Sequence, residues 1–183
     1  MLNRTRRRPP LHPERGTAVR RSILLALAAL AAGLLSACRG GDASGAAPDF
    51  SLSASDGRTV TLSGEKGRVV LLNFWATWCE SCAEEFPALQ ELQRARADGR
   101  FELLAVSVDD DPQKVVPSFA AKHGLTFPIL YADRRTQDAY AVRMLPTSFL
   151  IAPDGTIARR YVGPLDARAV ENDILVLLNR RPS

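Results

Sequence analysis

The chain has 183 residues, of which 46% are hydrophobic and 24% charged, ordinary values for a globular protein that exclude wholesale disorder. Its formal net charge of +4 is unevenly placed: residues 1–37 hold seven arginines and one acid, and the rest of the chain holds 17 basic and 19 acidic side chains. Because the part after residue 37 carries a net charge of −2, the composition argues against a nucleic-acid partner.

The N-terminal segment has the layout of an export signal. Arg20 and Arg21 precede an uncharged run of 14 residues (22–35), shorter than the roughly 20 residues of a membrane span but suited to a signal-peptide core. The run leads into Leu35-Ser36-Ala37-Cys38, which resembles the lipobox of bacterial lipoproteins. We therefore expect residues 1–37 to be a lipoprotein signal peptide and Cys38 to carry the lipid. The alternative is an uncleaved anchor followed by a free or disulfide-bonded Cys38; the twin arginines leave Sec and Tat export both open.

Lipidation of Cys38 also accounts for the odd number of cysteines. The chain has three, so Cys79 and Cys82 remain as one pair in an extracytoplasmic compartment where dithiols tend to oxidise. Small and polar residues follow Cys38, so residues 38–47 are expected to be the lipidated cysteine and a flexible tether. The folded domain is then expected over residues 48–181.

Strands and helices alternate along this domain. Short segments at 50–52 and 59–62 flank the turn residues Asp56-Gly57 and predict a β-hairpin. Apolar runs predict strands at 69–74, 101–108, 129–131, 147–151 and 157–162. Helices are expected at 80–97, from Pro112 to Gly124, over 137–142, and after the capping residue Asp166. This order predicts an α/β fold with a mixed central sheet flanked by helices.

The segment Trp78-Cys79-Glu80-Ser81-Cys82 carries the candidate chemistry. It follows a buried strand directly, so Cys79 falls at the start of a helix, where free backbone N–H groups and the helix dipole stabilise a thiolate. A thiol with a pKa of about 8.5 is roughly 3% ionised at pH 7, whereas one near 7 is about half ionised. Cys82 lies one turn along the same face, within disulfide reach. We therefore expect Cys79, rather than Cys82, to attack substrates.

Three other interpretations of the cysteine pair are possible. A structural disulfide would close a very short loop and so stabilise the chain little, by about 2 kcal/mol. A zinc site needs four ligands, and the chain adds only His12 and His123. A copper(I) site of two thiolates is chemically reasonable, although no Met or His lies close to the pair in sequence.

Four ordered motifs give the domain a specific resemblance. The run Asn73-Phe74-Trp75-Ala76 before the cysteines, with motifs at 47–50, 106–109 and 145–151, resembles the TlpA/ResA-like thiol-disulfide oxidoreductases of the thioredoxin superfamily. The resemblance covers about residues 46–180. It implies a thioredoxin-like fold with an N-terminal β-hairpin. We expect no bound cofactor and no metal.

The resemblance assigns roles to individual residues. It implies that Pro146 is cis and exposes the backbone at Leu145 to an extended substrate segment, whereas the alternative is an ordinary proline at a strand start. Trp78 is expected to cover the disulfide and contact substrate, unless it packs in the core.

Glu85 is the third candidate catalytic residue. It lies three residues after Cys82 on the same helix face, while Glu84 points elsewhere. The resemblance implies that Glu85 moves protons to and from the thiols, as a partly buried carboxyl with a raised pKa would do; the alternative is a solvated glutamate. Asn73 supports the catalytic role, because thioredoxins proper have a titratable Asp there and Asn cannot titrate. The run Asp109-Asp110-Asp111 lacks the spacing of a calcium loop and is expected to be a solvated turn.

These residues predict a lipid-anchored protein-disulfide oxidoreductase of the cell envelope. The resemblance implies protein disulfides such as those of apocytochrome c or a copper chaperone as substrates, and a membrane thiol-electron carrier as reductant. Exchange chemistry runs both ways, so a thiol oxidase or isomerase is the first alternative. A non-catalytic Cu(I)-delivery module is the second. A peroxiredoxin is disfavoured because the Pro-x-x-x-Thr turn that precedes its cysteine is absent.

Overall fold

The computed structural model describes residues 45–96 and 98–179. The predicted signal peptide, Cys38 and the tether up to residue 44 lie outside these residues, as do Ala97 and residues 180–181. In chain order the elements are β1 (Ser51–Ser53), β2 (Thr59–Thr61), the 3₁₀ helix η2 (Leu62–Glu65), β3 (Val69–Trp75), α2 (Glu80–Ala95), β4 (Phe101–Ser107), α3 (Pro112–His123), β5 (Ile129–Tyr131), α4 (Arg134–Ala139), β6 (Thr147–Ile151), β7 (Ile157–Val162) and α5 (Ala167–Leu178).

Five strands form a mixed sheet in the order β5-β4-β3-β6-β7. β3 pairs with β4, and β4 with β5, in parallel, whereas β3 with β6 and β6 with β7 are antiparallel. β1 and β2 form a separate antiparallel hairpin, with Leu52 opposite Val60. The predicted mixed sheet and N-terminal hairpin are both confirmed.

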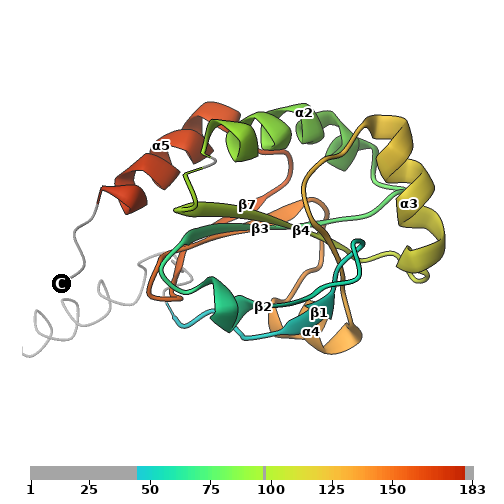
Figure 1. The fold of residues 1–183 in the computed structure, drawn as a ribbon, viewed down its shortest axis with the longest axis horizontal. Helices are drawn as coiled ribbons and strands as arrows, with labels where there is room; N and C mark the ends of the chain where they lie inside the picture. Colours follow the sequence, from blue (N-terminus) through green and yellow to red (C-terminus); the bar gives the residue numbers. More distant parts are fainter. Residues whose placement is uncertain (1–44, 97, 180–183) are drawn as a thin grey trace, which may run out of the picture. The chain divides into compact units, whose positions relative to one another are not determined.

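Helices α2, α3 and α5 cover one face of the sheet, and the hairpin with α4 covers the other (Figure 1). Successive side chains of β3 alternate between the two cores, as the pleat requires. Leu71 and Trp75 belong to the core under the three helices, and Leu72 and Phe74 to the core under the hairpin. Every residue of β3 is buried, as the unbroken apolar run predicted.

The element boundaries agree with the prediction to within two residues except at α4. A helix was expected over 137–142, but α4 runs from Arg134 to Ala139. It begins earlier because the side chain of Asp133 accepts a hydrogen bond from the backbone N–H of Thr136, at 2.7 Å, and caps it. It ends before Ala141, whose φ of 47° is not helical.

Within the described residues, no helix combines the length and the apolar character that crossing a membrane requires.

Candidate active site

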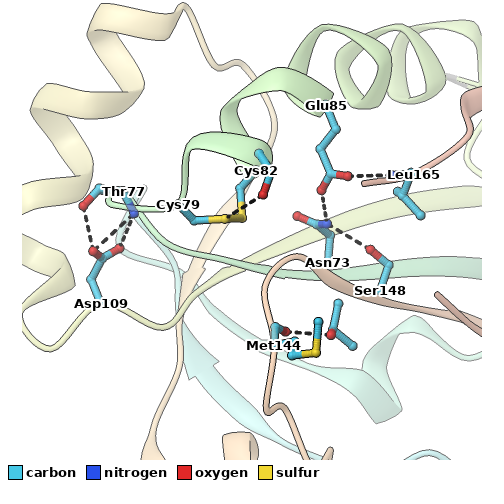
Figure 2. Close-up of a disulfide and its surroundings, with 11 residues drawn as sticks. Asn73, Thr77, Cys79, Cys82, Glu85, Asp109, Met144, Ser148 and Leu165 are labelled. Carbon is cyan, nitrogen blue, oxygen red and sulfur yellow. Dashed lines mark hydrogen bonds between the residues drawn. A yellow bond between two sulfur atoms is a disulfide. The ribbon is translucent and has the colours of Figure 1, made fainter. Parts of the chain in front are cut away.

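A disulfide joins Cys79 and Cys82 at the start of α2, where the chain turns from β3 into the helix (Figure 2). Cys79 is the N-cap residue and Cys82 lies in the first turn, which brings their Cα atoms to 5.3 Å. Cys79 keeps 8% of its surface exposed, whereas Cys82 has none. Of the two cysteines, Cys79 is therefore the one with surface open to the outside, and its expected role as nucleophile stays a prediction.

Ser81 contacts the exposed cysteine. Its Oγ lies 3.6 Å from the Sγ of Cys79. A disulfide sulfur carries no hydrogen, so the serine hydroxyl is the donor. The same O–H can donate to a thiolate when the pair is reduced, and such a bond is stronger because its acceptor is charged.

Asp109 holds the turn that presents the cysteines. Its carboxylate accepts hydrogen bonds from the backbone N–H of Thr77 at 3.0 Å, from Thr77 Oγ1 at 2.7 Å and from Ser107 Oγ at 2.8 Å. The N–H of Val108 also donates to the carbonyl of Trp75 at 2.9 Å. The turn after β3 is thus tied to the end of the neighbouring parallel strand β4.

The expectation of a solvated turn at Asp109–Asp111 is wrong for its first residue. Asp109 is 7% exposed, while Asp110 and Asp111 are exposed. The three acids are equivalent in the sequence, but only Asp109 follows β4 closely enough to reach the N–H groups of the adjacent turn.

Glu85 lies under α2, facing the sheet, and Glu84 is exposed, as the helical spacing predicted. Glu85 Oε1 accepts a hydrogen bond from Asn73 Nδ2 at 2.7 Å, and Oε2 accepts one from the N–H of Leu165 at 3.0 Å. Asn73 Nδ2 also donates to Ser148 Oγ, at 2.9 Å (Figure 2). The carboxyl is only 4% exposed, so it is not a solvated helix glutamate.

Burial raises the pKa of Glu85 above its ordinary value, and the hydrogen bonds from Leu165 and Asn73 offset part of that rise. A carboxyl with a raised pKa can accept a proton and release it again near neutral pH. Glu85 and Cys82, which forms half of the disulfide, occupy successive turns of the same helix.

The substrate-binding candidates lie at the start of β6 and in the turn before α2. The Leu145–Pro146 peptide bond is cis, as predicted, and the carbonyl of Pro146 accepts the N–H of Gly163 at 2.8 Å. Leu145 packs against the core that contains both cysteines. Trp78 is 71% exposed, which excludes the alternative of core packing for its side chain. Met144, which precedes Leu145 in the chain, is 62% exposed and adds a second apolar surface next to the cis bond.

The part of the chain that the structure describes brings no three His, Cys, Asp or Glu side chains together as a group that could hold a metal ion. The two sulfurs are bonded to each other. The predicted lipidation residue, Cys38, lies outside the described residues.

The sequence interpretation missed the contacts of Asp109, Ser148 and Ser81. Ser148 could have been placed on the helix-covered face, because Leu150, two residues later in β6, belongs to that core. Its pairing with Asn73 required the register between β3 and β6, in which the two residues are opposite each other.

A family model described as "AhpC/TSA family" matches residues 43–160, which include the hairpin, both cysteines and the cis-proline strand. The chain belongs to the AhpC/TSA family. Its curated relatives include proteins named as thiol-disulfide oxidoreductases. The thiol-disulfide oxidoreductase ResA of Geobacillus thermodenitrificans is 40% identical over 130 residues, 70% of this chain and 74% of that protein.

Solved structures agree with this assignment. A Chlorobium tepidum protein described as a thiol:disulfide interchange protein DsbE has a TM-score of 0.70 and 34% identity, covering 75% of this chain and 99% of that one. The exposed lipoprotein thioredoxin Etrx1 of Streptococcus pneumoniae has a TM-score of 0.61 and 28% identity, covering 71% and 100%. The fold is thioredoxin-like, and this AhpC/TSA protein is a thiol-disulfide oxidoreductase of the ResA/DsbE type.

Proposed function

We propose that the protein reduces disulfide bonds of other proteins on the extracytoplasmic side of a membrane, with Cys79 as nucleophile, Cys82 as resolving thiol and Glu85 as proton acceptor. The unequal exposure of the two cysteine residues, 8% for Cys79 and none for Cys82, carries this proposal, because it distinguishes the attacking from the resolving cysteine. The buried Glu85 on the same helix supports it by supplying a base that the neutral Asn73 cannot be.

The reaction begins with both cysteines reduced. The Cys79 thiolate attacks a substrate disulfide: a bond forms between Cys79 and one substrate sulfur, the substrate's own S–S bond breaks, and one substrate thiolate leaves. Cys82, after giving its proton to Glu85, attacks the Cys79 sulfur and releases the second thiolate. Two electrons pass to the substrate, the Cys82 proton held by Glu85 and one proton from solvent convert the two substrate thiolates to thiols, and the Cys79–Cys82 disulfide remains.

Trp78, Leu145 and Pro146 are proposed to bind the substrate around this exchange. The exposed indole of Trp78 offers an apolar contact, and the backbone of Leu145 makes no turn, loop or cap hydrogen bond with another backbone group of the described residues. An extended segment next to the substrate disulfide could pair with that backbone as an added strand.

The anchor and the partners complete the proposal. Residues 1–37 act as a lipoprotein signal peptide, Cys38 carries the lipid, and residues up to 47 tether the domain that begins at residue 48. The lipobox-like Leu35-Ser36-Ala37-Cys38 supports this, and one structural relative is a lipoprotein. A membrane thiol-electron carrier re-reduces the pair, and the substrates are protein disulfides such as those of apocytochrome c or a copper chaperone.

A redox titration of the soluble domain against dithiothreitol and glutathione buffers tests the direction of electron flow. A reductase is expected to have a potential nearer to about −270 mV than to about −120 mV. A value near the latter would assign the oxidase role instead. Copper bound after anaerobic reduction, together with no reduction of insulin, would replace catalysis with copper delivery.

A further inference from the structure

Three buried polar side chains meet between α2 and the sheet, among the apolar side chains of that core. Glu85 comes from α2, Asn73 from β3 and Ser148 from β6; they are 4%, 0% and 0% exposed. Asn73 stands between Leu71 and Trp75 on the helix-covered face of β3, and Ser148 is its partner across the β3–β6 ladder. Figure 2 shows the carboxyl of Glu85 directed at the amide of Asn73, with Ser148 on the far side.

The hydrogens of the Asn73 amide are fully used. One donates to Glu85 Oε1 at 2.7 Å and the other to Ser148 Oγ at 2.9 Å. Its carbonyl oxygen, Oδ1, is buried and accepts no hydrogen bond from the described residues. The Asn73 amide therefore presents its N–H group, and not its carbonyl oxygen, to the Glu85 carboxyl. This orientation matches an ionised carboxylate, because a protonated Oε1 would place its hydrogen against an N–H group.

The opposite orientation of the amide is disfavoured. With Glu85 ionised, rotating the amide by half a turn would set Oδ1 against Glu85 Oε1, acceptor against acceptor, and would leave two N–H donors buried without partners instead of one carbonyl. Buried donors without acceptors are costly. Ser148 contributes to this preference, because its hydroxyl oxygen accepts the second N–H and fixes the plane of the amide.

Glu85 has no cationic ion-pair partner within the described part of the chain. Among the described residues, no Lys, Arg or His forms an ion pair with it. Its own helix contributes Cys82, and β3 and β6 contribute the neutral Asn73 and Ser148. Tyr161 of β7 is opposite Ser148, and its hydroxyl donates to Asp173. Asp166, which follows Leu165, is exposed and caps α5. The ionised form is thus supported by two N–H donors, from Asn73 and from the backbone of Leu165.

We propose that Asn73, anchored by Ser148, is a positioning residue that holds the Glu85 carboxylate in its ionised form and so sets the pH at which Glu85 can take a proton from the cysteine pair. This inference rests on the proposed catalytic role of Glu85. The direction of the Asn73 contribution agrees with it: burial raises the pKa of Glu85, and the Asn73 hydrogen bond lowers it. The buried amide of Asn73 therefore takes no proton itself and instead shifts the pKa of the neighbouring Glu85.

The test is a direct titration of Glu85 by carbon-13 NMR of its side-chain carboxyl, in the oxidised protein and without substrate. Asn73→Leu, which keeps the volume and removes the amide, is expected to raise the titration midpoint by about one pH unit, a tenfold change in the dissociation constant. Ser148→Ala is expected to raise it by a smaller amount. Thr147→Val is the matched control: it removes a buried hydroxyl from the adjacent position of β6, where the hydroxyl bonds the Met144 carbonyl, and should leave the midpoint unchanged.

A midpoint that stays at the wild-type value in folded Asn73→Leu and Ser148→Ala would overturn the inference. If Asn73→Leu does not fold, Ser148→Ala decides alone. Exchange rates separate this outcome from a failure of the proposed function. In a Glu85→Gln background, Asn73→Leu should leave the pH profile of exchange unchanged, whereas a merely structural role would alter both backgrounds alike. If Glu85→Gln exchanged disulfides at the wild-type rate at every pH, Glu85 would have no part in the mechanism. The shift of the Glu85 titration midpoint in Asn73→Leu would still be measurable.

Discussion

The two cysteines differ in what surrounds each sulfur, although only Glu80 and Ser81 separate them. Cys79 is slightly exposed and contacts the Ser81 hydroxyl, whereas Cys82 is fully buried in the core under α2. Exposure decides which sulfur a bulky disulfide can reach, and the hydroxyl decides how well that sulfur holds a negative charge. Both features favour Cys79 as the nucleophile.

The Ser81 hydroxyl is expected to stabilise the Cys79 thiolate. In Ser81→Ala the reduced protein should lose a hydrogen bond to a charged group at a partly exposed site, and alkylation of Cys79 at pH 7 should slow by roughly threefold to tenfold. The measurement is the rate of iodoacetamide reaction against pH. Ser81→Thr keeps a hydroxyl and should stay close to the wild type; equal rates in all three proteins would show that the contact has no effect on reactivity.

The buried Glu85 is expected to make stability depend on pH. Its pKa is raised in the folded protein above 4.5, so the folded state binds the proton more tightly than the unfolded chain does. The free energy of unfolding should therefore decrease as the pH rises from about 4.5 through the folded pKa. Urea denaturation at several pH values should show this decrease in the wild type and a flatter curve in Glu85→Gln.

The same variant tests the proton transfer. Glu85→Gln removes the acceptor for the Cys82 proton, so disulfide exchange should slow by about a hundredfold at neutral pH, the lower end of the usual range for a general base. Unchanged folding with unchanged exchange would return Glu85 to a structural role.

At the scale of the elements, the turn between β3 and α2 is held by a carboxylate from the neighbouring strand. Asp109 accepts from both the N–H and the hydroxyl of Thr77, and Ser107 orients it. Two parallel strands that end at the same edge make this clamp possible, since β3 and β4 are in register up to Trp75 and Ser107.

Loss of the clamp should both destabilise the protein and slow exchange. Asp109→Asn keeps one acceptor oxygen and loses the charge, so the free energy of unfolding should fall by about 2 kcal/mol. Asp110→Asn is the matched control, because the adjacent carboxyl is exposed. Urea denaturation of both variants measures the difference, and equal stabilities would contradict the clamp.

The sequence predicted the elements well where their signals are local. The buried strand 69–74, the turn glycines and the cap Asp166 all act within a few residues, and each was found where expected. The α4 boundary was missed because the capping role of Asp133 competes with several other polar residues nearby. Contacts between strands, such as Asn73 with Ser148 or Thr77 with Asp109, could not be predicted because they depend on register across distant parts of the chain.

At the scale of the whole molecule, one domain carries the redox pair and a separate N-terminal segment is proposed to carry the membrane attachment. If Cys38 is the lipidated residue, the protein should sediment with membranes and incorporate labelled fatty acid in its bacterial host. Cys38→Ser should abolish the label and release the domain, with insulin reduction by the purified domain unchanged. Labelling that persists in Cys38→Ser would contradict the proposed anchor.

Trapping of the mixed disulfide tests the division of labour between Cys79 and Cys82 most directly. Cys82→Ser, incubated with a protein disulfide, should accumulate a covalent complex through Cys79 that dithiothreitol releases, because the resolving thiol is missing. Cys79→Ser should trap almost none, since the remaining sulfur is enclosed. Mass spectrometry of the two variants that found equal trapping, or trapping through Cys82 alone, would contradict the account.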